Sequence, residues 1–475
     1  MSRLALILLL AGAYVGCATR TPAPVAAPVR PEPASGGDLR ILIGSGLTAR
    51  EVVESAVAGS LVPGAGIVRT LASVDGPDGV CFTLGISGRY PGGKPVRPAD
   101  LVADWETRLR DPRSALRWLL QDVRGVESLL DGSATSVTGL TARDRNLGIC
   151  LRQAGHDFEE RLSHPAMAHR GGTEAAGPGP FLDSGSGTLS ANRDHVGRPP
   201  ALERIRLVDS DEDPRLLFRL NEVDLALVHG RTAAALLDDG DPAVVLRRFD
   251  RWERRYFLWL DASRRWLNDP AFRVWLAESI DRDGLVRFLF DGRGRPLFSL
   301  SPAGSAEPVW AASTRRPFAS PSQPRLTLDF DQADRTAGDI AARIRAELAL
   351  AGVQIELRGG PLGELRRALA RGETSIVLLA HRPSLADPVL GLLESVWWLG
   401  RGSERAVQRL LRASAGADDG MRADEAWLAE YELLTEVRLV PLVGLEAWLA
   451  GAAGLEGVEA GAAGRLDLER ARWAR

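Results

Sequence analysis

The chain has 475 residues, of which 45% are hydrophobic and 25% are charged, a balance typical of a folded protein with more than one lobe. Its 59 Lys and Arg residues nearly balance its 62 Asp and Glu residues, which argues against a general nucleic-acid binder. Three cysteines are too few for a disulfide-dense scaffold or for a zinc or iron–sulfur site with several cysteine ligands.

The first 17 residues are typical of an export signal. Arg3 supplies a positive charge, an apolar run of about a dozen residues follows, and the segment ends at Cys17. This run is shorter than the roughly 20 residues that a membrane-spanning helix needs. The last four residues, YVGC, resemble the bacterial lipobox, with Tyr14 where Leu is usual, and predict that Cys17 is acylated. An ordinary secretory signal with an incidental cysteine is the alternative.

Residues 18–35 are rich in Pro and Ala and have no apolar periodicity, which predicts an extended tether behind Cys17. We therefore expect an extracytoplasmic protein of the cell envelope that is held to a membrane by its lipid anchor. Ala18 would direct such a lipoprotein to the outer membrane in a Gram-negative cell and carries no such implication in a Gram-positive cell.

The rest of the chain predicts alternating strands and helices, from apolar runs and from apolar residues at three- and four-residue spacing. Strands are expected at 38–44, 79–87, 147–151, 202–208, 225–229, 255–261, 325–330, 353–357 and 375–379. Helices are expected at 98–110, 214–220, 270–288, 340–350 and 365–370. This alternation predicts an α/β fold of mixed sheets with helices on both faces.

A series of segments resembles, in the same order, the extracytoplasmic solute-binding proteins of family 5, the peptide/nickel class that serves ABC importers. The segments are Gly36–Arg40, Phe82–Leu84, Tyr90–Trp105, Gly177–Phe181, Asn221–Asp224, Asp269–Arg282, Val440–Leu442 and Gly464–Trp473. The chain departs from the family at Gly92, where Asp is usual, at Pro178, where Thr is usual, and at Asn221, where Gly is usual.

The resemblance implies an α/β, periplasmic-binding-protein-like fold of the class II, cluster C type, with two lobes of mixed sheets flanked by helices and an extra small subdomain in the first lobe. It assigns residues 36–77, 179–262 and 435–475 to the first lobe, residues 78–178 to the small subdomain and residues 263–434 to the second lobe. It also implies a monomer without a cofactor that captures a small solute, an oligopeptide above all, for ABC permease subunits by closure of the lobes.

A Gly/Pro-rich turn between the subdomain and the first lobe is predicted to be the hinge of that closure, because glycine relaxes the backbone while proline fixes its neighbours. Its residues are Gly177, Pro178, Gly179, Pro180 and Phe181. A plain surface loop is the alternative.

The resemblance also points to a ligand-binding segment. Peptide-binding members carry an Asp that pairs with the α-ammonium of the peptide, and alignment on Pro388 places Ser384 at that Asp and His381 at a preceding Trp. Ser384 has no charge, so a ligand ammonium would lack its usual partner in a closed cleft. The candidate ligand-binding residues are His381, Ser384, Asp387, Trp397 and Trp398. For the two tryptophans, core packing is the alternative.

Cys81 and Cys150 are candidates for a disulfide. In both strands the apolar residues alternate and leave the cysteine on the opposite face. If the strands are neighbours, the two thiols point to the same side in an oxidising compartment. Two separately buried thiols are the alternative.

Catalytic and metal-binding patterns are weak. His156, His164 and His169 suggest a metal-binding face, but Pro165 interrupts the helix that would align them. No nucleophile–base motif is found, so we expect no metal site and no enzyme. The main alternative keeps the fold but makes the protein an envelope scaffold or protein-interaction lipoprotein without a transport role, as Ser384 and Gly92 favour.

Overall fold

The computed structural model describes residues 37–474, apart from residues 45–46, 63–65, 77–78, 113, 153–156, 172–176, 198, 302–323, 400–403, 416–417 and 461–464. The predicted export signal, Cys17, the tether and His156 therefore lie outside the described residues. Within the described part of the chain, no helix combines the length and the apolar character that a membrane crossing requires.

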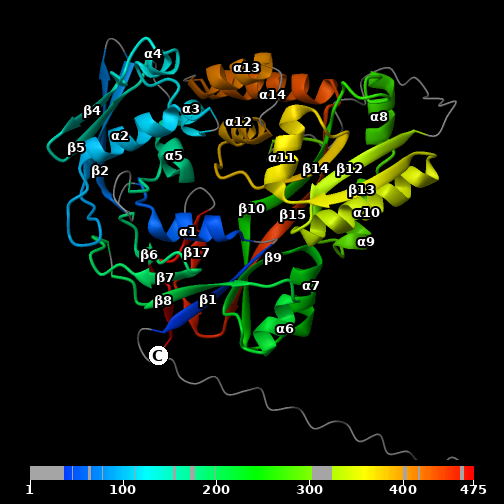
Figure 1. Cartoon of the computed structure of the whole chain (residues 1–475), viewed down its shortest axis with the longest axis horizontal. Coiled ribbons are helices and arrows are strands. Elements are labelled where there is room, and N and C mark those ends of the chain that lie inside the picture. Colours follow the sequence, from blue (N-terminus) through cyan, green and yellow to red (C-terminus); the bar gives the residue numbers. More distant parts are fainter. Residues whose placement is uncertain are drawn as a thin grey trace, which may run out of the picture. The chain divides into compact units, whose positions relative to one another are not determined.

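A mixed sheet of 11 strands extends through both lobes (Figure 1). Its order is β13-β12-β14-β10-β15-β9-β1-β8-β7-β6, and β11 pairs with β15. The strands are β1 (Asp38–Ile43), β6 (Phe181–Asp183), β7 (Thr188–Ala191), β8 (Arg204–Asp209), β9 (Leu225–His229), β10 (Val244–Leu260), β11 (Arg295–Pro296), β12 (Arg325–Asp331), β13 (Gln354–Gly360), β14 (Ile376–His381) and β15 (Leu439–Ala452). β1 lies parallel to β8 and β9, and β12 lies parallel to β13 and β14.

Two long strands run from the first lobe, which contains β1 and β6–β9, to the second lobe, which contains β12–β14. The early part of β10 pairs with the end of β15, which also pairs with β9, and the late part of β10 pairs with β14. The ladder between β10 and β15 is antiparallel and is interrupted between Phe249 and Arg254. The prediction of a strand at 255–261 therefore found only the second-lobe part of a 17-residue strand.

A separate four-stranded sheet of order β2-β3-β5-β4 forms the small subdomain. Its strands are β2 (Val68–Gly76), β3 (Gly79–Ile86), β4 (Leu140–Arg143) and β5 (Asn146–Cys150). Its helices are α2 (Pro98–Leu109), α3 (Leu116–Leu119), α4 (Val126–Leu130), α5 (Phe158–Ser163) and the single turn η1 (Pro165–Met167). β2 falls in the range assigned to the first lobe from the sequence, but it pairs along its length with β3 and so belongs to the subdomain sheet.

Cys81 and Cys150 lie opposite each other in the antiparallel strands β3 and β5, and the structure joins them in a disulfide. Val80, Phe82 and Leu84 of β3 are buried. The apolar face of β3 therefore packs inward and leaves Cys81 on the other face of the sheet, as the alternation in the sequence predicts.

The remaining helices flank the large sheet. α1 (Ala49–Val57), α6 (Pro214–Arg219) and α7 (Gly230–Asp239) belong to the first lobe. The second lobe contains α8 (Pro270–Glu278), α9 (Arg282–Leu289), α10 (Arg335–Leu350), α11 (Leu362–Arg371), α12 (Pro388–Leu399), α13 (Glu404–Ala415) and α14 (Asp419–Thr435). Four short strands near the C-terminal end pair as β16 (Leu455–Glu456) with β19 (Arg472–Trp473) and β17 (Glu459–Ala460) with β18 (Leu466–Asp467).

The single helix predicted at 270–288 is wrong, because two helices occupy this range. α8 ends at Glu278, and the carboxylate of Asp281 then accepts a hydrogen bond of 2.8 Å from the backbone N–H of Gly284. A side chain that satisfies a free N–H in this way starts a new helix, here α9.

Segments that carry the family resemblance contact one another. Arg40 Nη2 lies 2.7 Å from Asp224 Oδ1, which joins the first strand to the corner that precedes β9. Within that corner, Asn221 has a φ of 57°, a left-handed conformation that Gly adopts freely and Asn tolerates better than most residues. Arg282 donates a 2.9 Å hydrogen bond to the carbonyl of Pro441. These residues therefore stabilise the fold.

Among the described residues, buried apolar side chains form two clusters in the first lobe, one of them around α6 and α7, and a larger cluster that includes both the subdomain and the second lobe. Leu39, Ile41, Phe181 and Ile205 belong to the larger of the two first-lobe clusters, which we call the first-lobe cluster. Phe82 and Trp105 of the subdomain and Ile340, Leu378 and Leu410 of the second lobe belong to the larger cluster. Apolar packing thus connects the subdomain with the second lobe, although the chain inserts the subdomain into the first.

Candidate functional site

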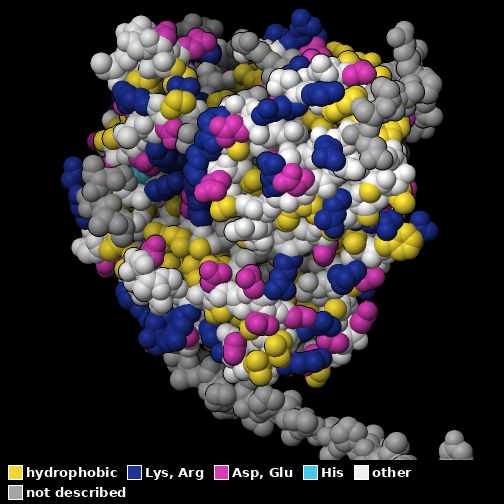
Figure 2. All heavy atoms as spheres, turned by 45° about the vertical axis from the view of Figure 1, so that its right-hand side comes forward, with side chains coloured by type: hydrophobic (Ala, Val, Ile, Leu, Met, Phe, Trp, Pro, Cys, Tyr) yellow, Lys and Arg dark blue, Asp and Glu magenta, His cyan; other side chains and the backbone are white. Residues whose placement is uncertain are grey.

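A cavity of about 620 Å³, which we call the charged cavity, lies where the first lobe, the subdomain and the second lobe meet. Its ionisable lining residues are Arg50, Glu51, Glu54, Arg108, Asp111, His164, Arg170, Arg382, Glu394 and Arg465. Among the described lining residues, only Ala115, Pro165 and Ala166 are apolar. Figure 2 shows Lys and Arg side chains gathered around a hollow in the left part of the face in view.

Helix α1 brings two carboxylates to this cavity. Thr48 and Glu51 form a capping box at its start, in which Glu51 Oε2 accepts a hydrogen bond of 2.7 Å from the backbone N–H of Thr48. Glu51 Oε1 also lies 2.6 Å from Arg382 Nη2 of the second lobe. One turn later, Glu54 Oε1 lies 2.9 Å from Arg170 Nη2, at the end of the subdomain. Helix α1 therefore makes ion pairs with both neighbouring parts of the chain.

Glu394 is a buried carboxylate on the second-lobe side of the cavity. Its Oε2 accepts a 2.7 Å hydrogen bond from the backbone N–H of Ser384, and its Oε1 lies 3.6 Å from His164 Nε2. Burial alone would raise the pKa of Glu394, but the hydrogen bond and charge of His164, with His381 and Ser384, lower it to about 2. Glu394 is therefore an anion that is already engaged by groups of the protein.

Of the predicted ligand-binding residues, only Ser384 lines the charged cavity. His381 is buried at the end of β14, where its charge acts on Glu394. Trp397 packs against the larger apolar cluster, which agrees with the core-packing alternative. The side chain of Trp398 lies outside the described part of the structure.

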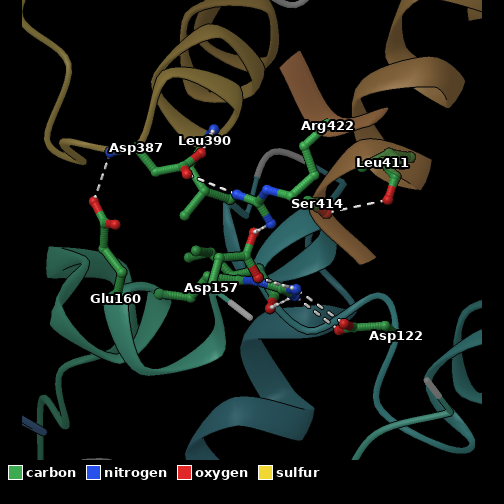
Figure 3. Close-up of polar contacts among 10 residues, drawn as sticks. Asp122, Asp157, Glu160, Asp387, Leu390, Leu411, Ser414 and Arg422 are labelled. Carbon is green, nitrogen blue, oxygen red and sulfur yellow. Dashed lines mark hydrogen bonds and ion pairs between the residues drawn. The ribbon is translucent and has the colours of Figure 1, made fainter. Parts of the chain in front are cut away.

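Asp387 belongs to a network of charges that we call the ionic bridge, between the subdomain and the second lobe (Figure 3). Its Oδ2 lies 2.6 Å from Arg422 Nη2 of α14, and its Oδ1 caps the first turn of α12. Arg422 Nη1 in turn lies 3.8 Å from Asp157 Oδ2 of the subdomain. Glu160 Oε1 accepts backbone hydrogen bonds from Ala386 (2.6 Å) and Asp387 (2.9 Å). The carboxylate of Asp387, a candidate ligand-binding residue in the sequence, is thus paired within the protein.

The subdomain end of the ionic bridge is held by Arg161 of α5, which is fully buried. Its guanidinium binds Asp122 through two hydrogen bonds of 2.8 and 3.0 Å and Asp157 through two of 2.7 and 2.9 Å. Burial raises the pKa of Asp157, against the opposing effect of Arg161 and Arg422. Because burial makes an unpaired charge costly, the guanidiniums of Arg161 and Arg422 and the carboxylates that they contact depend on one another.

The turn predicted as the hinge packs against the first lobe. The backbone N–H of Gly179 donates a 2.8 Å hydrogen bond to the carbonyl of Val57 at the end of α1. A Cβ atom at Gly177 or Gly179 would come within 2.4 or 2.5 Å of Val57, so this close approach requires glycine. Phe181 is buried in the first-lobe cluster. The turn connects the subdomain with the first lobe, whereas β10 and β15 connect the two lobes. The role of the turn as a hinge stays a prediction.

A second cavity, of about 520 Å³, lies along these two connecting strands. Glu253 of β10 lines it and contacts Arg255 (2.9 Å) and Arg295 (2.6 Å). Residues 383, 385 and 386 line this second cavity, whereas residues 382 and 384 line the charged cavity. The segment aligned with the ligand-binding segment of the family therefore contributes to both.

The sequence analysis missed the charged residues of the cavity wall. Arg382 and Glu394 flank the aligned segment, and a search for charged neighbours of Ser384 would have found them. Arg465 and Glu54 had no such signal, because 411 positions separate them in the chain. Their contact follows from the fold alone.

No family model and no curated protein matches the chain. Solved structures do. DppA from Helicobacter pylori in complex with the peptide STSA is 14% identical, with a TM-score of 0.73 over 93% of this chain and 99% of that chain. NikA from Staphylococcus aureus in complex with Ni(L-His)2 is 13% identical, with a TM-score of 0.72 over 92% and 100%. AgaA from A. tumefaciens R10 in complex with agropinic acid is 16% identical, with a TM-score of 0.71 over 92% and 99%.

The chain has the periplasmic-binding-protein-like fold. This confirms the fold class predicted from the sequence, since the structural neighbours include the peptide- and nickel-binding proteins of the resembled family. The three neighbours hold a peptide, a nickel complex and an organic acid on the same fold. The fold therefore leaves the choice of solute to the residues of the site.

Proposed function

We propose that the protein is an extracytoplasmic solute-binding lipoprotein that captures a small solute for an ABC importer by closure of its lobes. The observation that carries the proposal is a charged cavity with walls from both lobes and the subdomain, in a fold shared with solute-binding proteins over 92–93% of the chain. A solute in this cavity contacts all three parts at once, so it binds the closed form more tightly than the open form.

The ion pair between Glu51 and Arg382 lies at the junction of the lobes in this proposal. It joins α1 of the first lobe to the end of β14 in the second lobe, and both residues line the cavity. Opening of the lobes separates the two side chains and exposes them to water. Closure on a solute re-forms the pair, which favours the form that a permease recognises.

Mass spectrometry of small molecules that copurify with the full chain, extracted from its membrane in detergent, tests the capture of a solute. We expect one solute to be recovered and to raise the unfolding temperature of the stripped protein, because a solute at 100 times its Kd adds about 2.7 kcal/mol to stability. Recovery of nothing, with no thermal shift across a library of peptides and other small solutes, contradicts the proposal and favours the envelope scaffold.

Absence of turnover separates the binder from an envelope hydrolase. The recovered solute, incubated with the full chain, should come back unchanged. Its conversion to products would contradict the proposal that the protein is not an enzyme.

The anchor is proposed at Cys17, with the signal peptide removed in front of it. In a Cys17→Ser variant, we expect the protein to leave the membrane fraction or to keep its signal peptide, because the thiol that accepts the acyl chain is lost. Membrane fractionation with intact-mass analysis measures both outcomes. A variant that fractionates and is processed like the wild type would show that the lipid anchor is not there.

Export to an oxidising compartment also predicts that the disulfide of Cys81 and Cys150 forms in the mature protein. Intact-mass analysis after alkylation under denaturing conditions without reductant should show neither cysteine labelled. After reduction, both should be labelled. Labelling of both without reductant would support two free thiols instead.

A further inference from the structure

Two arginines of the charged cavity meet at Glu54. Arg170 Nη2 lies 2.9 Å from the carboxylate of Glu54, and Arg465 Nη2 donates a 2.9 Å hydrogen bond to its backbone carbonyl. Arg170 comes from the end of the subdomain and Arg465 from the segment just before β18. A guanidinium has five N–H groups, so each of these contacts leaves donors for a further acceptor in the cavity.

Arg465 is a buried cation whose described hydrogen bond is not with a carboxylate. It is 9% exposed, and its side chain reaches a backbone carbonyl rather than a carboxylate. Burial lowers the pKa of Arg465 to about 10, the charge of Arg170 lowers it as well, and Glu54 opposes both effects. The group stays positive at neutral pH, and an anion beside it would offset the cost of burying that charge.

The three glutamates of the described cavity wall are engaged by groups of the protein. Glu54 is shared between Arg50 (2.8 Å) and Arg170. Glu51 caps α1 and pairs with Arg382. Glu394 accepts the backbone N–H of Ser384. The carboxylates of these glutamates are therefore occupied, whereas Arg170 and Arg465 bring N–H donors to the wall.

The rest of the wall argues against the two other classes of solute. An apolar solute would remove water from charged side chains without replacing the hydrogen bonds, which is costly. A solute held mainly by an ammonium group would have to compete for a carboxylate, because the three glutamates of the wall already have partners and Ser384 carries no charge. A negatively charged solute meets neither obstacle.

We propose that the solute is a small organic anion whose carboxylate or phosphate group binds Arg170 and Arg465 in the charged cavity. The inference rests on the proposed function and names the class of solute for the same site. Planar guanidinium groups suit both oxyanions, because two parallel N–H groups match two oxygens.

Calorimetric titration of the full chain in detergent, after removal of any copurified solute, tests the charge of the solute directly. The probes are L-glutamyl-L-glutamate, its amide L-glutaminyl-L-glutamine, L-lysyl-L-lysine, succinate and inorganic phosphate. We expect an acidic probe to bind most tightly, with succinate and phosphate distinguishing the two oxyanions. Affinity should fall as salt increases, because ions screen the attraction.

Variants locate the site. Arg465→Gln and Arg170→Gln should each raise the Kd of the acidic probe by about 10-fold or more. This is the loss expected when a charge-assisted contact is removed from a partly desolvated site. Arg371→Gln is the matched control, because Arg371 is an exposed arginine of α11, paired with Glu373, and does not line the charged cavity. Arg465→Lys keeps the charge and loses the planar fork, so it should bind with intermediate affinity.

Glu54→Gln gives an effect of opposite sign. Removal of a carboxylate that competes for Arg170 should increase the affinity for the acidic probe, whereas it would decrease the affinity for a cationic probe. Thermal unfolding of each variant without a probe separates loss of binding from loss of folding.

The outcomes distinguish the inference from the proposed function. Preferential binding of the neutral or basic dipeptide, recovery of a solute without an anionic group, or weaker acidic binding in Glu54→Gln overturns the anionic solute and leaves solute capture intact. Failure of every probe to bind, with nothing copurified, overturns both. Tight acidic binding that depends on Arg465 and Arg170 but not on Arg371 supports both.

Discussion

The ionic bridge and the charged cavity use the same residue types in opposite ways. In the bridge, Arg161 is fully buried and its guanidinium makes four hydrogen bonds to two aspartates. In the cavity, Arg465 is nearly as buried, but the described contact of its guanidinium is with a carbonyl. Complete pairing turns the first arginine into a structural anchor, whereas incomplete pairing beside a cavity leaves the second one suited to binding.

Burial alone therefore does not identify a functional charge. Both arginines would be costly to bury without partners, and the bridge supplies those partners from within the chain. In the cavity, a bound solute would supply part of the pairing for the buried charge.

Loss of the bridge anchor should have the largest effect. In Arg161→Met, the carboxylates of Asp122 and Asp157 stay buried without their main partner, so we expect the free energy of unfolding to fall by about 3–5 kcal/mol. Urea unfolding measures the change. Arg152→Met is the matched control, because Arg152 is an exposed arginine of the same subdomain that pairs with Glu127. Similar losses in both variants would remove the distinction between anchored and surface arginines.

On the cavity side, Glu394 should make the free energy of unfolding depend on pH in the acidic range. Its pKa in the folded protein is about 2, below the ordinary value of 4.5. Its stabilisation, roughly 3 kcal/mol, is therefore complete above pH 4.5 and is lost as the pH falls from 4.5 toward 2. Urea unfolding across this range should show a smaller acid-dependent loss in Glu394→Gln than in the wild type. Parallel curves for the two proteins would contradict the assignment.

Loss of the other end of the bridge should have an intermediate effect. Arg422 pairs closely with Asp387 but lies 3.8 Å from Asp157, so Arg422→Gln should lower the free energy of unfolding by about 2 kcal/mol. The subdomain should also separate more readily from the second lobe, which small-angle scattering without solute would detect as a larger radius of gyration. An unchanged radius together with unchanged stability would show that the bridge does not hold these parts together.

The smallest effect is expected at the rim of the cavity. The side chain of Arg50 is 75% exposed and pairs with Glu54 one turn away on α1. Such pairs contribute about 0.3 kcal/mol, so Arg50→Ala should leave thermal unfolding almost unchanged. A fall in the free energy of unfolding of more than about 1 kcal/mol would mean that the exposure of an arginine in this cavity does not predict its contribution to stability.

The sequence predicted most of the elements that carry the fold, because their signals are local. The alternation in β3 and β5 placed Cys81 and Cys150 on equivalent faces, and the helix predicted from residue 270 begins there as α8, although it ends earlier than predicted. β10 was found only in its second half. Its first half carries Arg247 and Arg248, which interrupt the apolar pattern, and its pairing with β15 holds it in the sheet.

The site was harder to predict, because its contacts join distant parts of the chain. Alignment with the family identified Ser384 at the cavity, but it also suggested Asp387, whose carboxylate is bound by Arg422 of a helix that the sequence analysis did not predict. Nothing in the local pattern around Arg465 indicates that it reaches Glu54. In an arginine-rich chain, only the tertiary structure separates an anchor from a candidate ligand-binding group.

The interruption between Phe249 and Arg254 bears on how much work a movement of the lobes would require. The intervening residues of β10 have no partner in the register with β15, so a bend confined to them breaks no rung of that ladder. The sheet would then oppose bending only weakly at this point. The balance between open and closed forms would be set by side chains, and evolution could tune it by changing a few charges while leaving the backbone scaffold untouched.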